Sequence, residues 1–215
     1  MDHDQLFTLI SVLGVAVFAA SGALAAGRQR FDLIGAAFLA GVTALGGGTL
    51  RDLLLDIHPV FWVRQPVILW STIIAAALAL VTVRFLRPPW KALLVADALG
   101  LAFFSIVGVQ VAESAGEGGL VAVVMGLLTG VAGGVLRDMM SGEVPLLFRP
   151  SETLYATASL AGISCYLLAQ PAGLARGWAA LAGMVVILAL RLTAIVRGLR
   201  LPALEVPPPP EESAR

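Results

Sequence analysis

A glycine-rich motif that ends in Arg-Asp occurs twice in this chain, 86 residues apart. The first copy, residues 46–52, is Gly-Gly-Gly-Thr-Leu-Arg-Asp, and the second, residues 132–138, is Ala-Gly-Gly-Val-Leu-Arg-Asp. At the same offset Leu13, Gly14, Phe18, Gly22, Thr43 and Pro59 correspond to Leu99, Gly100, Phe104, Gly108, Thr129 and Pro145. One gap-free offset across this span indicates an internal duplication.

The composition restricts the chain to a membrane. Of its 215 residues, 59% are hydrophobic and 13% are charged, whereas soluble domains are about 25% charged. The formal net charge is zero and no basic cluster alternates with aromatic residues, so nothing indicates a nucleic-acid partner. The single Cys165 excludes an internal disulfide and a thiolate metal site. We therefore predict an all-α integral membrane protein.

Seven segments are apolar enough for membrane helices, each of which needs about 20 residues to cross a bilayer. They are residues 5–26, 32–55, 66–86, 92–112, 119–141, 152–170 and 175–198. The second and fifth carry the glycine motifs. We expect a first three-helix repeat in residues 1–90, a second in 91–172, a seventh helix in 173–200, and a disordered, Pro/Glu-rich cytoplasmic tail in 201–215.

The orientation follows from the helix count and the arginines. Three helices per repeat make the second copy enter the membrane from the opposite side, so the repeats are inverted. With the N-terminus outside, the inner side receives Arg28, Arg30, Arg84, Arg87, Lys91, Arg149, Arg191, Arg197 and Arg200. The outer loops receive only Arg64 and Arg176. The positive-inside rule therefore favours an outer N-terminus and a cytoplasmic C-terminus.

The glycine clusters predict kinks in the second and fifth helices. Three glycines in succession, Gly46, Gly47 and Gly48, favour a helix break that leaves backbone carbonyls and amides available to a solute. Gly133 and Gly134 are expected to do the same in the second copy. The alternative is close helix packing, since Gly126, Gly130 and Gly134 are spaced four residues apart.

Each glycine cluster is preceded by a threonine and followed by an Arg-Asp dipeptide. Thr43 and Thr129 are expected either to line a pore or to bond back to carbonyls of their own helices. Neighbouring helix positions point about 100° apart, so we predict that Arg51 pairs with Asp138 and Arg137 with Asp52, across the repeats. The alternative is that these residues extend to the lipid headgroups and anchor the helices.

Asp97 lies close to the start of an apolar run. It is expected either to attract a cation or to cap the helix. His3 and His58 have no ligand-like spacing around them, so we predict no metal site beyond transient monovalent cations, and no cofactor. No catalytic grouping and no phosphate-binding loop is present in the sequence, which argues against an enzyme.

The doubled motif, the run Asp-Ala-Leu-Gly-Leu-Ala-Phe-Phe at 97–104 and the three-plus-three-plus-one layout resemble the prokaryotic branch of the trimeric intracellular cation channel family. The resemblance covers about residues 5 to 200. It implies a homotrimer in which the second and fifth helices of each protomer line a pore for monovalent cations, potassium first and sodium second. The family's kink glycines fall on Gly46, Gly47, Gly48, Gly133 and Gly134. Ala132 departs from this pattern, since it stands where the first copy has Gly46.

These observations leave three functional hypotheses. The first is a potassium-permeable channel of the bacterial inner membrane, whose partners are cations, membrane lipids and its own copies. It predicts that the charge pairs Arg51, Asp52, Arg137 and Asp138 control gating. The second is a secondary transporter of a small zwitterion such as an amino acid, with Asp97 binding the ammonium group. The third is a non-transporting scaffold, which dry packing around both glycine clusters would favour.

Overall fold

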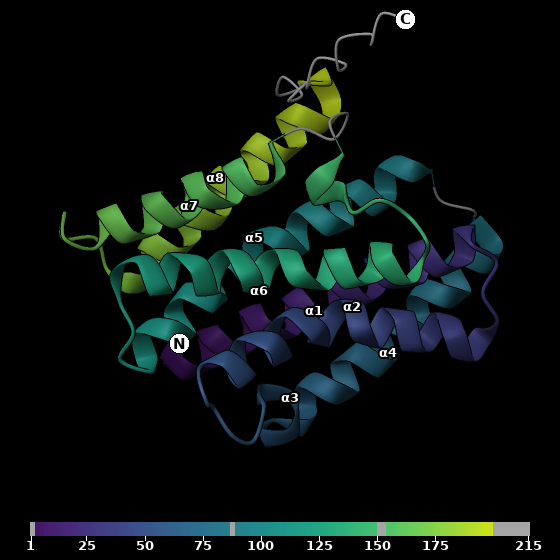
Figure 1. Ribbon diagram of the computed structural model, residues 1–215, viewed down its shortest axis with the longest axis horizontal. Helices are drawn as coiled ribbons and strands as arrows, with labels where there is room; N and C mark the ends of the chain where they lie inside the picture. The colour runs from purple at the N-terminus through teal and green to yellow at the C-terminus, as the bar shows by residue number, and fades with distance from the viewer. Residues whose placement is uncertain (1–2, 87–88, 150–153, 200–215) are drawn as a thin grey trace, which may run out of the picture.

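A computed structural model describes residues 3–86, 89–149 and 154–199 of the chain, and every regular element in these ranges is helical (Figure 1). The long helices are α1 (His3–Arg28), α2 (Leu33–Leu54), α4 (Pro66–Leu86), α5 (Trp90–Ser114), α6 (Gly119–Met140), α7 (Tyr155–Ala169) and α8 (Arg176–Arg197). Two short elements, α3 (Phe61–Arg64) and η1 (Leu146–Phe148), follow the two glycine-motif helices. The prediction for the tail, residues 201–215, falls outside the described residues.

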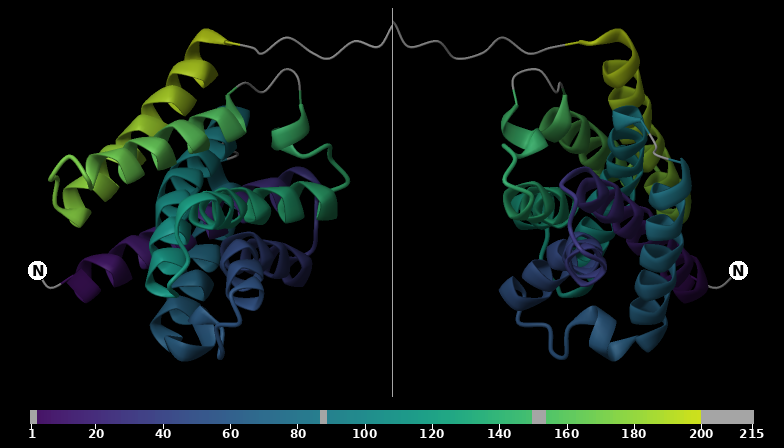
Figure 2. Two further views of the ribbon diagram at one scale, coloured as in Figure 1. Left: turned by 60° about the vertical axis from the view of Figure 1, so that its left-hand side comes forward. Right: turned by 90° about the vertical axis from the view of Figure 1, so that its right-hand side faces the viewer.

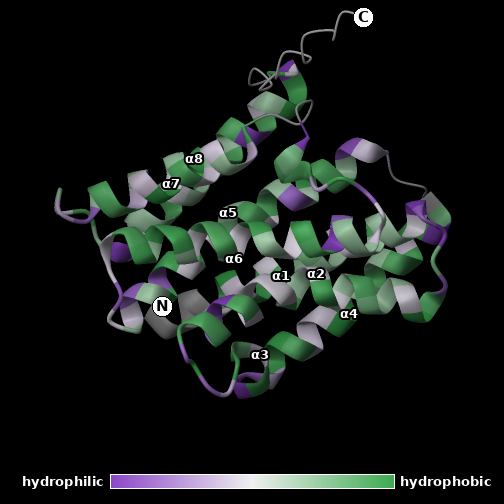
Figure 3. Cartoon of the chain, in the orientation of Figure 1, coloured by the Kyte–Doolittle hydropathy of each residue, from purple (hydrophilic) through white to green (hydrophobic). Residues whose placement is uncertain are grey.

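All seven predicted segments contain a long helix, with ends within three residues of the expected positions. Six of these helices are long and apolar enough to cross a membrane, and the described part of α7, with 15 residues, is shorter. Large apolar side chains on their outer faces, such as Ile34, Phe38, Trp70 and Phe85, are exposed (Figure 3 shows the mostly hydrophobic helices). The chain is therefore a multi-pass helical membrane protein.

Several helix boundaries have a local cause. Asp32 caps the start of α2, where its carboxylate accepts a hydrogen bond of 2.7 Å from the Gly35 amide. Pro66 is the first residue of α4, a position that needs no amide hydrogen. The left-handed conformation of Gly198, with φ of 63°, ends α8.

The central helices α1 and α5 pack against each other in opposite directions. A side chain at Gly14 would touch Phe104, and one at Gly100 would overlap Phe18. The two phenylalanines stack with ring centroids 5.3 Å apart. The contact of Gly14 with Phe104 is thus repeated by the counterparts of these two residues, Gly100 and Phe18. The packing therefore has the two-fold pseudosymmetry expected of inverted repeats.

The glycine-motif helices α2 and α6 cross in the same way. A Cβ atom on Gly47 would overlap the carbonyl oxygen of Thr129, and one on Gly133 would overlap that of Thr43. Both helices continue as α-helix through their glycines. The expected kinks are therefore not confirmed, and the alternative expectation, close packing of two backbones, describes the contact.

The two repeats differ in their third helix. α4 packs against α1 and α2, whereas α7 packs mainly against α8, which in turn packs against α5. The views in Figure 2 show α7 and α8 side by side, at one edge of the bundle. The seventh predicted helix therefore forms the surface on which the second repeat places its third helix.

The crossing predicts a position-dependent effect of added methyl groups. Gly47→Ala should lower the free energy of unfolding by about 1–3 kcal/mol, because the methyl group must separate two packed backbones. Gly41→Ala, on the same helix with open space around it, should be neutral or stabilising by up to about 1 kcal/mol. Thermal unfolding of the detergent-solubilised variants measures both effects, and equal effects would contradict close packing at Gly47.

Candidate functional site

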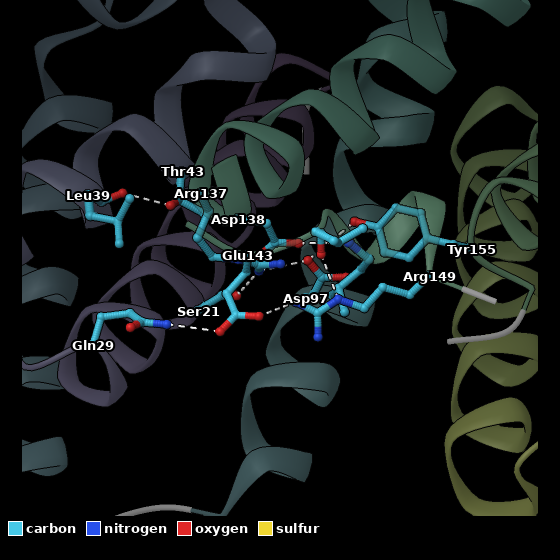
Figure 4. Close-up of polar contacts among 12 residues, drawn as sticks. Ser21, Gln29, Leu39, Thr43, Asp97, Arg137, Asp138, Glu143, Arg149 and Tyr155 are labelled. Atoms are coloured by element: carbon cyan, nitrogen blue, oxygen red, sulfur yellow. Dashed lines mark hydrogen bonds and ion pairs between the residues drawn. The ribbon is translucent and has the colours of Figure 1, made fainter. Parts of the chain in front are cut away.

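Arg137 is the centre of a buried polar cluster at one end of the α2–α6 crossing. Its Nη1 donates hydrogen bonds to Asp97 Oδ1, at 2.8 Å, and to Ser21 Oγ. Its Nε donates to Asp138 Oδ1, also at 2.8 Å. Arg137 and Asp97 are fully buried. Figure 4 shows how α1, α5 and α6 contribute these side chains to one cluster.

Two further helices add side chains to this cluster. The Tyr155 hydroxyl, from the start of α7, donates to Asp97 Oδ1 at 3.2 Å. Arg191, from α8, places Nη2 3.8 Å from Asp97 Oδ2 and its guanidinium 4.6 Å from the centre of the Tyr155 ring. Two arginines thus face two carboxylates, Asp97 and Asp138, and the formal charge of the cluster is zero.

The first repeat has a simpler cluster around Arg51. Its Nε and Nη2 donate to Asp52 Oδ1 at 2.9 and 2.7 Å, and its guanidinium lies 5.4 Å from the centre of the Phe61 ring. The second carboxylate oxygen of Asp52 accepts the Phe61 amide at 2.7 Å. Arg51 is 2% exposed and Asp52 is fully buried.

Each aspartate of the doubled motif also holds the short element that follows its helix. As Asp52 accepts the first amide of α3, Asp138 Oδ2 accepts the Leu146 amide of η1 at 2.8 Å. Each aspartate thus uses one carboxylate oxygen for the guanidinium of the preceding arginine and the other for a backbone amide. The motif therefore ties the end of each glycine helix to the loop beyond it, a role that the sequence did not reveal.

The predicted pairing across the repeats is wrong. Each arginine binds the aspartate next to it, because the long guanidinium side chain folds back onto the neighbouring carboxylate. The antiparallel crossing also places Arg51 and Asp138 about 20 Å apart along the helix axes. The anchoring alternative is wrong as well, since Arg51 and Arg137 are buried rather than extended to the surface.

Thr43, Thr129 and Asp97 each have a hydrogen-bond partner in this conformation. Thr43 and Thr129 donate to carbonyls one turn back in their own helices, those of Leu39 and Met125, at 2.6 and 2.5 Å. Asp97 does not cap α5, because that helix begins seven residues earlier, at Trp90. Its side chain belongs to the Arg137 cluster.

Sequence reasoning missed Tyr155 and misplaced Arg191. We assigned Arg191 to the inner end of the seventh helix, whereas its side chain is fully buried beside Asp97. The signal was available, because Arg191 interrupts an apolar run that continues on both sides, and a charge at such a position usually faces the inside of a bundle.

The Arg137 cluster predicts a large cost for losing Asp97. Asp97→Ala leaves two buried guanidiniums with one carboxylate, and we expect it to lower the free energy of unfolding by about 3–5 kcal/mol. Ser11→Ala, at the equivalent position of the first repeat, should cost about 1 kcal/mol or less, since Ser11 forms no ion pair. Unfolding of both variants in detergent measures the difference, and a small effect at Asp97 would contradict its structural role.

The comparisons with known proteins agree with this architecture. The family described as Glycine transporter matches residues 8–84 and again residues 94–171. The UPF0126 inner membrane protein YadS of Escherichia coli K12 is 44% identical over 200 residues, 90% of this chain and 93% of that protein. A UPF0126 membrane protein of Vibrio cholerae is 42% identical over 201 residues, 92% of this chain and 82% of that protein.

A solved structure has the same fold. It is that of the TRIC trimeric intracellular cation channel orthologue from Rhodobacter sphaeroides, with 35% identity and a TM-score of 0.82 over 90% of this chain and 98% of that one. The chain therefore belongs to the family described as Glycine transporter, and its predicted membership of the trimeric intracellular cation channel family is confirmed.

Proposed function

We propose that this protein is a monovalent cation channel of the bacterial inner membrane, with potassium as its main ion. Each protomer of a homotrimer would contain its own pore, lined by α2 and α6. The observation that carries this proposal is the neutral, buried Arg137 cluster at one end of a glycine crossing, in a chain that shares its fold with a cation channel orthologue at 35% identity.

Charge neutralisation supports cation passage. An unpaired buried arginine would repel potassium, but Arg137 and Arg191 face Asp97 and Asp138. A permeating ion would then meet carbonyls, hydroxyls and a nearly neutral wall, which suits a weakly selective path. Asp97 would attract the cation when its contact with Arg137 opens.

The crossing of α2 and α6 supports a closed gate in this conformation. Gly47 and Gly133 bring the two helices into backbone contact between the Arg51 and Arg137 clusters. We propose that bending at Gly46, Gly47 and Gly48 and at Gly133 and Gly134 separates the helices and turns the Thr43 and Thr129 hydroxyls toward the path. The ion pairs Arg51–Asp52 and Arg137–Asp138 would hold the two ends of the α2–α6 crossing in the closed conformation.

The organisation proposed for the chain has two inverted units, residues 1–90 and 91–172, with α8 within 173–200 as a separate supporting helix. The N-terminus would lie outside, and the C-terminus with residues 201–215 inside the cell. The exposed apolar faces, such as those around Phe38 and Trp70, would contact lipids and the other protomers.

Carrier function is less well supported. A carrier for a small zwitterion needs a carboxylate that is available to an ammonium group. In this structure Asp97 Oδ1 already accepts from Arg137 and Tyr155, and Oδ2 faces Arg191. The geometry therefore favours a channel over transport of an amino acid.

The direct test is a planar bilayer that contains the purified protein under a potassium chloride gradient. We expect discrete current steps that reverse toward the potassium equilibrium potential and disappear when choline replaces potassium. A silent bilayer with inserted, folded protein, together with saturable amino-acid uptake into liposomes that needs no potassium, would instead establish the carrier.

The charge pairs predict an effect on gating. Arg51→Ala and Arg137→Ala should each change the open probability several-fold while the potassium-to-sodium permeability ratio changes little, because the pairs hold closed ends rather than select ions. Lys91→Ala, an exposed charge near the start of α5, is the matched control and should behave as wild type. Unchanged open probability in both arginine variants would count against the proposed role.

A further inference from the structure

A small pocket lies beside Arg51, at the opposite end of the crossing from the Arg137 cluster. It has a volume of about 40 Å³, and its lining includes Ser11 of α1, Arg51 of α2, Arg64 and Gln65 at the end of α3, and Val107 of α5. None of the residues that line it is acidic. A cavity needs about 10–15 Å³ of such space to hold one water molecule, so the pocket has room for a small ion or a group of a few atoms.

The internal repeat identifies what this pocket lacks. At the offset of 86 residues, Ser11 and Val107 occupy the positions of Asp97 and Ser21. Asp97 and Ser21 are the two groups that accept hydrogen bonds from Nη1 of Arg137. Arg51 has lost both partners, and its Nη1 donates no hydrogen bond within the described residues, although its side chain is 2% exposed.

The numbers of positive and negative groups at the two ends of the crossing also indicate that an anionic group is missing beside Arg51. At the Arg137 end, two guanidiniums face two carboxylates. At the Arg51 end, Arg64 lies close enough to interact electrostatically with Arg51, and Asp52 is the carboxylate that pairs with Arg51. One negative charge is therefore missing at the position where the second repeat has Asp97.

We propose that this pocket binds a small monovalent anion, either chloride or the carboxylate group of a small solute, in place of the missing aspartate. Arg51 Nη1 would supply the charged donor, and the Ser11 hydroxyl a second one. The Gln65 amide also lines the pocket, and its Oε1 has no hydrogen-bond partner in the described part of the chain. Rotation of that amide would present its NH₂ group to the anion. Exposed Arg64 would give the mouth a positive potential.

Binding is tested by thermal unfolding of the full-length protein in detergent, at constant potassium, with gluconate exchanged for chloride or formate, or with glycine added to the gluconate buffer. We expect a saturable rise of about 3 °C with a small anion. A response to chloride identifies a halide site, and a response to formate and glycine without chloride identifies a carboxylate site. No response to any of the three would overturn the proposal, whatever the outcome of the bilayer experiment.

Replacing Ser11 with aspartate, the residue at its repeat counterpart Asp97, gives the most direct test. Ser11→Asp restores the covalent carboxylate, so in gluconate it should unfold at the temperature that the wild type reaches only with its anion, and the anion response should vanish. Ser11→Asn has the same size without the charge, and should lose the response without gaining stability. Equal unfolding temperatures for these two variants in gluconate would contradict an anion site.

A substitution at the exposed mouth of the pocket tests anion binding without disturbing the buried core. Arg64 is exposed, so Arg64→Gln should fold normally. Loss of its charge should raise the anion concentration at half-maximal response about three-fold, whereas Arg84→Gln, an exposed arginine at the other end of the bundle, should leave it unchanged. An unaltered midpoint in Arg64→Gln would contradict the proposed positive mouth.

Discussion

A charged side chain buried within a membrane protein needs a partner of opposite charge, because hydrocarbon offers it neither water nor a high dielectric. The contacts of the buried arginines in this molecule meet that requirement. The buried arginines of the doubled motif bind the carboxylate next in sequence, and that carboxylate uses its second oxygen to hold the loop beyond the helix. In the second repeat the same requirement draws α5, α7 and α8 together around Arg137, through Asp97, Tyr155 and Arg191.

Close approach of the helices is the second constraint, and glycine satisfies it. Gly47 and Gly133 meet carbonyl oxygens of the opposite helix, so the α2–α6 crossing has no room for a methyl group. The contact is nearly symmetric because the chain is duplicated, but the two ends differ. One end has a complete set of ion pairs, and the other has Ser11 and a small pocket where the repeat has an aspartate.

The helices, their boundaries and the family could be predicted because each depends on local sequence. Apolar length identified the seven helical segments, and the doubled motif identified the repeat. The pairing of Arg51 could not be predicted, since it depends on the direction in which α2 and α6 cross and on a side-chain torsion that brings the guanidinium onto Asp52. The glycine helices were expected to kink because successive glycines weaken a helix, yet both helices run through their glycines and pack against each other there.

The claim that the α2–α6 crossing closes the ion path is tested most directly by locking it. A Cβ atom on Gly46 of α2 would lie 2.7 Å from Cδ1 of Leu136 on α6, so cysteines at these two positions, with Cys165→Ser, should form a disulfide across the crossing. The decisive measurement is bilayer current from this variant before and after reduction, with the disulfide verified by mass spectrometry of its peptides. We predict no current while the disulfide is present and wild-type current after reduction. Full current through the cross-linked protein would contradict a gate at this crossing.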